Sequence, residues 1–177
     1  IKNTNNPEDP GTIIVKDADP ITHKGEITGI AGKKNFTVIA IEKAFMNSEI
    51  GFGRRLLSVL ETNGISFEHM PSGIDTISLV IADSYLEGKL EKVLREIKME
   101  CEPDSVEVYP NMALIATVGR GMAYTPGIAG RLFSALGKNN INVRMIDQGS
   151  SEINIIVGVE TEDFEAAIRA IYEEFVR

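Results

Sequence analysis

The chain has 177 residues, a formal net charge of -8 and a single cysteine. This length allows one compact domain or two small ones. The negative charge argues against a nucleic-acid partner, because phosphate binding needs a basic face, and no apolar run is long enough to predict a membrane span. One cysteine cannot form an intrachain disulfide, which fits a reducing compartment such as the cytoplasm.

The first part of the chain is irregular. Residues 1–25 are polar, contain three prolines and begin with Ile1 rather than Met, which predicts a linker or the tail of a preceding domain in a longer protein. Within them only residues 12–15 have the character of a strand. Residues 27–31 are a short strand candidate, which the Gly-Lys-Lys sequence at 32–34 is expected to close.

A complete α/β unit is predicted next, over residues 36–109. Its strands are short β-rich apolar runs, and its helices have apolar residues at helical spacing, such as Phe52, Leu56 and Leu60. The expected elements are strand 36–41, helix 52–63, strand 66–70, strand 76–82, helix 86–97 and strand 106–109. This β-α-β-β-α-β order is typical of a ferredoxin-like unit, an α+β fold whose antiparallel sheet carries its helices on one face.

The amino-acid sequence of this unit is repeated later in the chain: residues 36–81 match residues 112–157 at a constant offset of 76 without a gap. Gly51 matches Gly127 and Arg55 matches Arg131. A repeat of this length indicates a duplicated folding unit. The second copy is expected to contain strand 112–118, helix 127–139, strand 143–147, strand 153–159 and helix 164–175.

The second copy ends without its last strand, and an open sheet edge is a feature that proteins usually avoid. The strand at 27–31, ahead of the first copy, is left over. We therefore expect it to complete the second sheet, so that the first unit is inserted within the second. The predicted division is a linker at 1–25, a first unit at 36–109, and a second unit made of 26–35 with 110–177.

The residues that could support catalysis do not cluster. Gly51-Phe52-Gly53 lies between a strand and a helix but lacks the third glycine of a dinucleotide-binding loop. His23 and His69 lie in different elements, and with one cysteine they do not make a zinc site of the usual spacing. The chain by itself is expected to be non-catalytic and to need no cofactor or metal.

The loop before the first helix is a better candidate for binding. Free N–H groups at a helix N-terminus can hold a carboxylate, and Gly51 and Gly53 would let a ligand approach the backbone closely. We expect the next strand to begin beneath this loop, so that Glu68 could hold an ammonium group. Carboxylate and ammonium sites together predict a receptor for a free amino acid. In the alternative interpretation, Asn47 or Ser48 caps the helix and Glu68 is a solvated surface charge.

The two copies are not expected to be equivalent sites. Arg144 stands where the first copy has Glu68, and its charge would repel the ammonium group of the same ligand. The second loop, Arg120 to Pro126, is therefore expected to be structural, or to contact the first copy of a partner subunit.

The repeated text resembles the tandem ACT modules at the C-terminus of bacterial aspartokinases. The first copy contains GFGRRLLSVLETNGISFEHMPSGIDTISLVI, the second contains TPGIAGRLFSALGKNNINVRMIDQGSSEINIIVGV, and residues 139–157 are the most specific part. The N-terminal NTNNPEDPGTII looks like the last strand region of the aspartokinase catalytic domain. In this family the first ACT module is inserted within the second, and modules from two subunits pair side by side with effectors at their interface.

The resemblance implies a function for the parent protein. Such an enzyme is an ATP:L-aspartate 4-phosphotransferase, the first step toward lysine, threonine and methionine. Its kinase domain, with ATP and Mg, would lie upstream and is absent from this chain, which should be inactive alone. The chain would bind an end-product amino acid for feedback inhibition.

The effector pocket of the family maps on residues from the loop, the next strand and the following turn of the first copy. The position of Glu68 is usually Asp in lysine-sensitive relatives. Glu keeps the charge but is longer by one methylene, so the resemblance does not fix the depth of the pocket. Asp75 or Glu49 could accept the side-chain ammonium of lysine, whereas threonine would need a hydroxyl partner such as Ser48 or Ser72. Lysine is favoured, and a ligand-free dimerisation module and a small enzyme remain the alternatives. The implied effector-binding residues are Met46, Asn47, Ser48, Gly51, Phe52, Gly53, Ser66, Phe67, Glu68, Gly73, Ile74 and Asp75.

Overall fold

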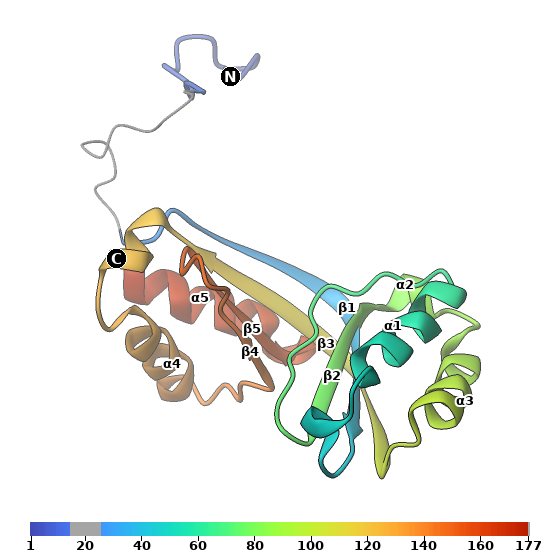
Figure 1. The fold of residues 1–177 in the computed structure, drawn as a ribbon. Coiled ribbons are helices and arrows are strands. Elements are labelled where there is room, and N and C mark those ends of the chain that lie inside the picture. Colours follow the sequence, from blue (N-terminus) through green and yellow to red (C-terminus); the bar gives the residue numbers. More distant parts are fainter. Residues whose placement is uncertain (15–25, 177) are drawn as a thin grey trace.

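The computed structural model describes residues 1–14 and 26–176. Its centre is a five-stranded sheet in the order β2-β1-β3-β5-β4, in which all neighbouring strands are antiparallel (Figure 1). The α+β class with antiparallel strands is therefore confirmed. The strands are β1 (Gly29–Glu42), β2 (Thr76–Ala82), β3 (Ser105–Val118), β4 (Met145–Asp147) and β5 (Asn154–Glu160).

The helices flank this sheet in two groups, one at each end (Figure 1). The first group covers the half of the sheet that contains β2, and the second covers the half that contains β4 and β5. The helices are α1 (Phe52–Thr62), α2 (Asp83–Leu86), α3 (Leu90–Cys101), α4 (Ile128–Lys138) and α5 (Phe164–Phe175). Short 3-10 turns are η2 (Met46–Ser48), η3 (Arg120–Tyr124) and η4 (Thr161–Asp163).

Two long strands, β1 and β3, run through both halves, where the sequence predicts two short strands in each case. The prediction of a turn at 32–34 is wrong. Gly32 is required there for close packing instead, because a Cβ atom on it would lie 2.6 Å from ring carbons of Phe164. Each long strand is bent by an asparagine in the left-handed region, with φ of 69° at Asn35 and 60° at Asn111. The register of β1 shifts around Phe36, which marks a β-bulge.

The first part of β1 pairs with the second copy of the repeat. Ile30 lies opposite Thr117 and Ala31 lies opposite Ala116 on β3, whereas β2 pairs only with Phe36 and the residues after it. This pairing supports the nested arrangement. The division into residues 36–109 and residues 26–35 with 110–177 stays a prediction.

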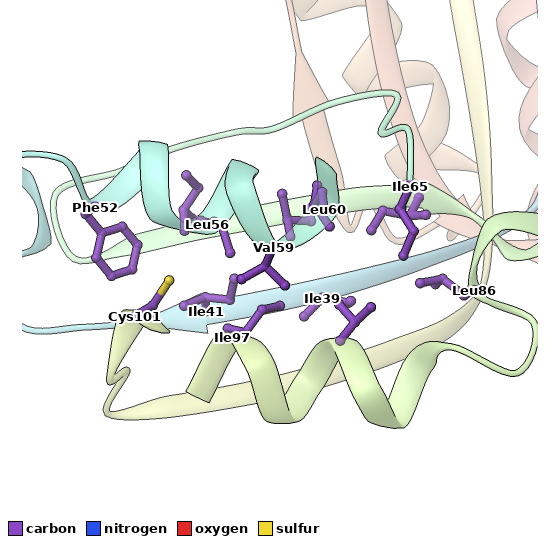
Figure 2. Packing of buried hydrophobic residues seen from close by; sticks show 14 of the residues in the cluster. Ile39, Ile41, Phe52, Leu56, Val59, Leu60, Ile65, Leu86, Ile97 and Cys101 are labelled. Atoms are coloured by element: carbon purple, nitrogen blue, oxygen red, sulfur yellow. The ribbon is translucent and has the colours of Figure 1, made fainter. Parts of the chain in front are cut away.

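Each half buries its own hydrophobic core between the sheet and a pair of helices. Figure 2 shows the first core, in which side chains of α1 and α3 meet those of β1. It contains Ile39, Ile41, Phe52, Leu56, Val59, Leu60, Ile97 and Cys101. The second core lies under α4 and α5 and contains Ile115, Leu132, Leu136, Ile155, Val157 and Ile171. Helical spacing predicted the buried face of α1 at Phe52, Leu56 and Leu60, and the apolar run at 36–41 predicted a buried strand, whereas Val59 and Cys101 were not predicted.

A third cluster joins the two halves on the opposite face of the sheet. Val38 belongs to it while its neighbours in the strand, Ile39 and Ile41, belong to the first core, as the alternation of side chains along a strand requires. Its buried members come from β1, β2, β3 and β4, so the sheet curls and brings its two ends together. They are Phe36, Val38, Val80, Ala82, Met112, Leu114 and Met145.

Three predicted elements differ from the structure. The helix expected at 86–97 is split, because Gly88 has φ of 67° and separates α2 from α3. The strand expected at 66–70 makes one isolated bridge, His69 with Val80, and Ser72 beyond it bridges Ile77. No continuous ladder forms there, because Pro71 between them has no N–H to donate. Residues 12–14 are not a strand: Ile13 and Ile14 are exposed and no strand lies beside them. Val15 and His23 lie outside the described residues.

Candidate functional site

The loop between β1 and α1 forms an open helix start. Phe45 has φ of 60°, and Gly51, which precedes α1, has φ of 84°. No side chain caps the N-terminus of α1; instead, the Ser48 hydroxyl donates to Oδ1 of Asn47 at 3.3 Å. The interpretation of Asn47 or Ser48 as the helix cap is therefore wrong. A Cβ atom on Gly53 would meet no other atom within 4 Å, so the backbone of the first helical turn is accessible.

The turn before β2, which contains Gly73, Ile74 and Asp75, lies against this loop. The backbone N–H of Asn47 donates to the carbonyl oxygen of Ile74 with an N···O distance of 3.1 Å. The N–H of Phe45 donates to Oδ1 of Asp75 at 2.8 Å. These bonds place the Asp75 carboxylate against the loop that leads from β1 to α1.

Two of the predicted site residues support the loop from inside. Met46 and Phe52 are 6% and 3% exposed and belong to the first core. Their side chains therefore shape the loop from below, where a ligand on the surface does not reach them. Ile50 and Phe45 are instead highly exposed at the rim of the same loop.

Glu68 does not lie beneath this loop, so that expectation is wrong. The N–H of Glu68 donates to the carbonyl of Val80 at 2.8 Å, and Val80 lies opposite Val38. The loop follows Glu42, four residues further along β1, which is about 13 Å away at the rise of a strand. The physical reason is direction: the segment after α1 runs parallel to β1, so it begins at the far end of the sheet. Ser66 and Phe67 lie at that end as well.

Glu68 and the next residue instead contact the second half of the molecule. Lys33 Nζ lies 3.7 Å from Oε1 of Glu68, and the two side chains are 66% and 46% exposed. His69 Nδ1 lies 2.9 Å from Oδ2 of Asp147 on β4, and the segment runs beside β4 in Figure 1. Sequence reasoning missed both contacts, because they depend on how the sheet curls.

Glu49 is occupied by two cations and anchors the loop to α3. Its carboxylate pairs with Lys43, at 2.9 Å, and with Arg55. The hydrogen bond from Lys43, reinforced by that from Arg55, holds the pKa of the Glu49 carboxyl below its ordinary value. Lys43 and Arg55 also donate to carbonyl oxygens at the end of α3, those of Cys101 and Glu100. Of the two acceptors predicted for a lysine side chain, Glu49 is therefore paired with cations, whereas Asp75 forms no ion pair within residues 1–14 and 26–176.

The second copy repeats the loop and adds a cavity. Gly127 has φ of 90° and precedes α4, which also lacks a side-chain cap. A cavity of about 310 Å³ opens beside this helix start, and its lining includes Tyr124, Thr125, Gln148 and Glu152. Sequence reasoning treated this loop as structural, although the match of Gly127 to Gly51 was the signal that could have found it.

Arg144 does not approach this second loop, for the topological reason that applies to Glu68. Its guanidinium pairs with Oε1 of Glu160 at 2.8 Å and lies 5.1 Å from the centre of the Tyr109 ring. The expected repulsion of a ligand in the second loop by Arg144 therefore has no basis in the geometry.

Among residues 1–14 and 26–176, no group of three or more His, Cys, Asp or Glu side chains is placed to hold a metal ion. Within the same ranges, every helix is too short or too polar to cross a membrane. Cys101 is a buried free thiol, and burial raises its pKa.

The comparisons with known proteins agree with this architecture. The profile of the ACT domain family matches residues 115–175. Aspartokinase 3 of Bacillus subtilis is 40% identical over 176 residues, which are 99% of this chain and 38% of that protein. The crystal structure of aspartate kinase from Clostridium acetobutylicum, described as an allosteric enzyme, superposes with a TM-score of 0.91 at 65% identity. The superposed part covers 98% of this chain and 40% of the Clostridium chain.

A more distant structure shares the fold. E. coli aspartokinase III, crystallised with lysine and aspartate, superposes with a TM-score of 0.73 at 23% identity over 88% of this chain and 35% of that one. The chain thus spans about two fifths of the length of the Bacillus and Clostridium proteins. These matches show that the chain is similar, over nearly its whole length, to the part of the aspartokinases that contains their ACT domains.

Proposed function

We propose that this chain binds an end-product amino acid, lysine in preference to threonine, and thereby lowers the activity of an aspartate kinase to which it belongs. The observation that carries this proposal is the uncapped start of α1 together with the preceding loop, to which the turn at Asp75 is hydrogen-bonded. Backbone N–H groups there can hold the ligand's carboxylate, and Asp75 can accept its side-chain ammonium group. Glu49 is unavailable for this role because two cations already surround it.

The preference for lysine follows from charge. Asp75 offers a carboxylate to a cationic side chain, whereas of the two hydroxyl partners considered for threonine, Ser48 and Ser72, the first already donates to Asn47. The E. coli relative crystallised with lysine supports the same choice.

The separation of the two groups of predicted residues within one chain supports a site shared by two copies. The loop of one copy would supply Asp75, and the outer segment of the other would supply Ser66, Phe67 and Glu68. A groove of about 650 Å³ beside this segment is lined by Leu57, Ile65 and Phe67, which suits side-by-side pairing of two copies. The remaining partners in this proposal are an upstream kinase domain that holds ATP and Mg, in the cytoplasm.

The second loop is a further candidate site. Its cavity of about 310 Å³ beside α4 has room for an amino acid, and Glu152 offers a carboxylate there. A ligand in this cavity would use the same helix-start chemistry as the first site.

The proposal is tested by thermal unfolding with lysine, threonine and methionine, followed by calorimetric titration. An amino acid at 100 times its Kd adds about 2.7 kcal/mol to the free energy of unfolding. We expect the largest shift with lysine. The absence of a shift with all three would leave the chain as a dimerisation module without a ligand.

Two variants locate the site. Asp75→Asn keeps an oxygen that accepts the Phe45 N–H but removes the charge, so lysine affinity should fall about tenfold or more. Asp104→Asn is the matched control, because Asp104 accepts the N–H of Ala44 in the same loop at 2.7 Å. Equal losses in the two variants would show that the loop, rather than the Asp75 charge, decides binding. Unchanged lysine affinity in Asp75→Asn would contradict a site at Asp75 and would favour the second loop as the binding site.

A further inference from the structure

We propose that Lys33 is an internal competitor of the effector: it pairs with Glu68 in the empty chain and is displaced when an ammonium group of the effector binds that carboxylate. This inference rests on the proposed function, in which Glu68 belongs to a shared amino-acid site. It adds a mechanism by which occupancy of that site is sensed within the chain.

The contact is suited to exchange. Lys33 Nζ lies 3.7 Å from Oε1 of Glu68, longer than a close ion pair, and both side chains are at least 46% exposed. Among the ion pairs of the described residues, Glu68 is matched with this one cation. A ligand ammonium group has the same charge as Lys33, so the two compete for one carboxylate.

The position of Lys33 gives the exchange a consequence. Lys33 lies opposite Leu114 in the part of β1 that pairs with the second half of the molecule, and its ammonium is 5.2 Å from the centre of the Phe36 ring. Phe36 belongs to the cluster that joins the two halves. The release of Glu68 therefore removes one polar contact between the halves, while the bond of His69 to Asp147 and the buried cluster around Phe36 still join them.

The solvent exposure of Lys33 and Glu68 limits how much their ion pair can change effector affinity. A solvent-exposed ion pair contributes little to stability, so the displacement of Lys33 lowers effector affinity by about two- to fivefold. By linkage, the effector weakens the contact of the two halves by the same factor.

The test is a calorimetric titration of lysine into the full chain and its variants at low salt. Lys33→Met keeps the apolar stem over Phe36 and removes the competing charge, so affinity should rise about two- to fivefold, with the gain shrinking as salt is added. Lys33→Arg should bind as the natural chain does. The matched control is Lys34→Met, because Lys34 pairs with Glu165 on α5 instead.

A double-mutant cycle completes the experiment. In a Glu68→Gln background, Lys33→Met should leave affinity unchanged, because there is no charge left to compete for. Equal affinity of Lys33→Met and the natural chain, or an equal gain in Lys34→Met, overturns the proposal for Lys33 and leaves the proposed function standing. No binding of lysine, threonine or methionine by the natural chain would overturn both.

Discussion

Glycines 51 and 53 show how single residues set the geometry of the candidate site. Gly51 has φ of 84°, in the left-handed region where side chains are strained, whereas Gly53 lies in the regular first turn of α1 with open space where a Cβ would stand. Gly51 is therefore required by the backbone conformation, whereas Gly53 leaves open space beside the first turn of α1.

The two glycines should respond differently to a methyl group. Gly51→Ala should lower the free energy of unfolding by about 1 kcal/mol, because an alanine is strained at positive φ. Gly53→Ala should leave stability equal or higher, since alanine favours a helix, but should weaken lysine binding by filling the open approach. Chemical denaturation and titration of the two variants check this, and tight binding by Gly53→Ala would argue against a ligand on this backbone.

Asn35 and Asn111 illustrate what residue-scale reasoning could not find. They stand at the same place in the two copies and both have positive φ, so each lets a strand bend and continue. From the sequence, each position looked like the boundary between two strands, because the register of a bulge depends on the partner strand.

At the scale of elements, repeated arginines tie the helices of each half together. Arg55 on α1 donates to the carbonyl of Glu100 at the end of α3, and Arg131 on α4 donates to the carbonyl of Glu174 near the end of α5. Each arginine also forms an ion pair with a carboxylate, which for Arg55 is that of Glu49. The offset of 76 residues between the arginines preserves a contact as well as a pattern.

The anchor at Glu49 should make loop stability depend on pH. Folding lowers its pKa from the ordinary 4.5, so its contribution is present above that value and is lost as the pH falls through the folded pKa. Glu49→Gln should therefore unfold at a lower temperature than the natural chain at pH 7, with the difference shrinking below pH 4.5. Thermal scans across this range measure it, and a difference independent of pH would show that the charge is not the cause.

The chain direction of the segment after α1 explains why the expected position of Glu68 is wrong. A strand that follows a helix crossover runs parallel to the strand before it, so Glu68 begins its segment far from the loop that ends β1. The turn at Gly73 to Asp75 returns to the loop and is hydrogen-bonded to it. The position of Glu68 depends on chain direction, which residue types and spacing do not record.

At the scale of the whole molecule, the curled sheet makes the two halves one cooperative unit. The cluster around Phe36, Val80 and Met145 contains residues from both halves. Separate cores alone would let the halves unfold independently, so this third cluster is what predicts a single transition.

Removal of a side chain from this cluster tests the coupling. Met145 is 8% exposed, and Met145→Ala should lower the free energy of unfolding by about 2 kcal/mol, at the low end for a buried methionine. Met99→Ala is the control, because Met99 is 74% exposed and its loss should cost almost nothing. Calorimetry should show a single transition in the natural chain, whereas two separate transitions would contradict the coupling.

The sequence by itself determined the local structure and the duplication, because apolar periodicity records which face of an element is buried and a repeat records a shared fold. The family resemblance also grouped the loop, Gly51 and the turn at Asp75, which the structure joins by hydrogen bonds between that turn and the loop. Only the tertiary structure decided the partners of Glu68, His69 and Arg144, the cations around Glu49 and the cavity beside α4. Those contacts join residues far apart in the chain, and their distances depend on strand direction, bulges and the curl of the sheet.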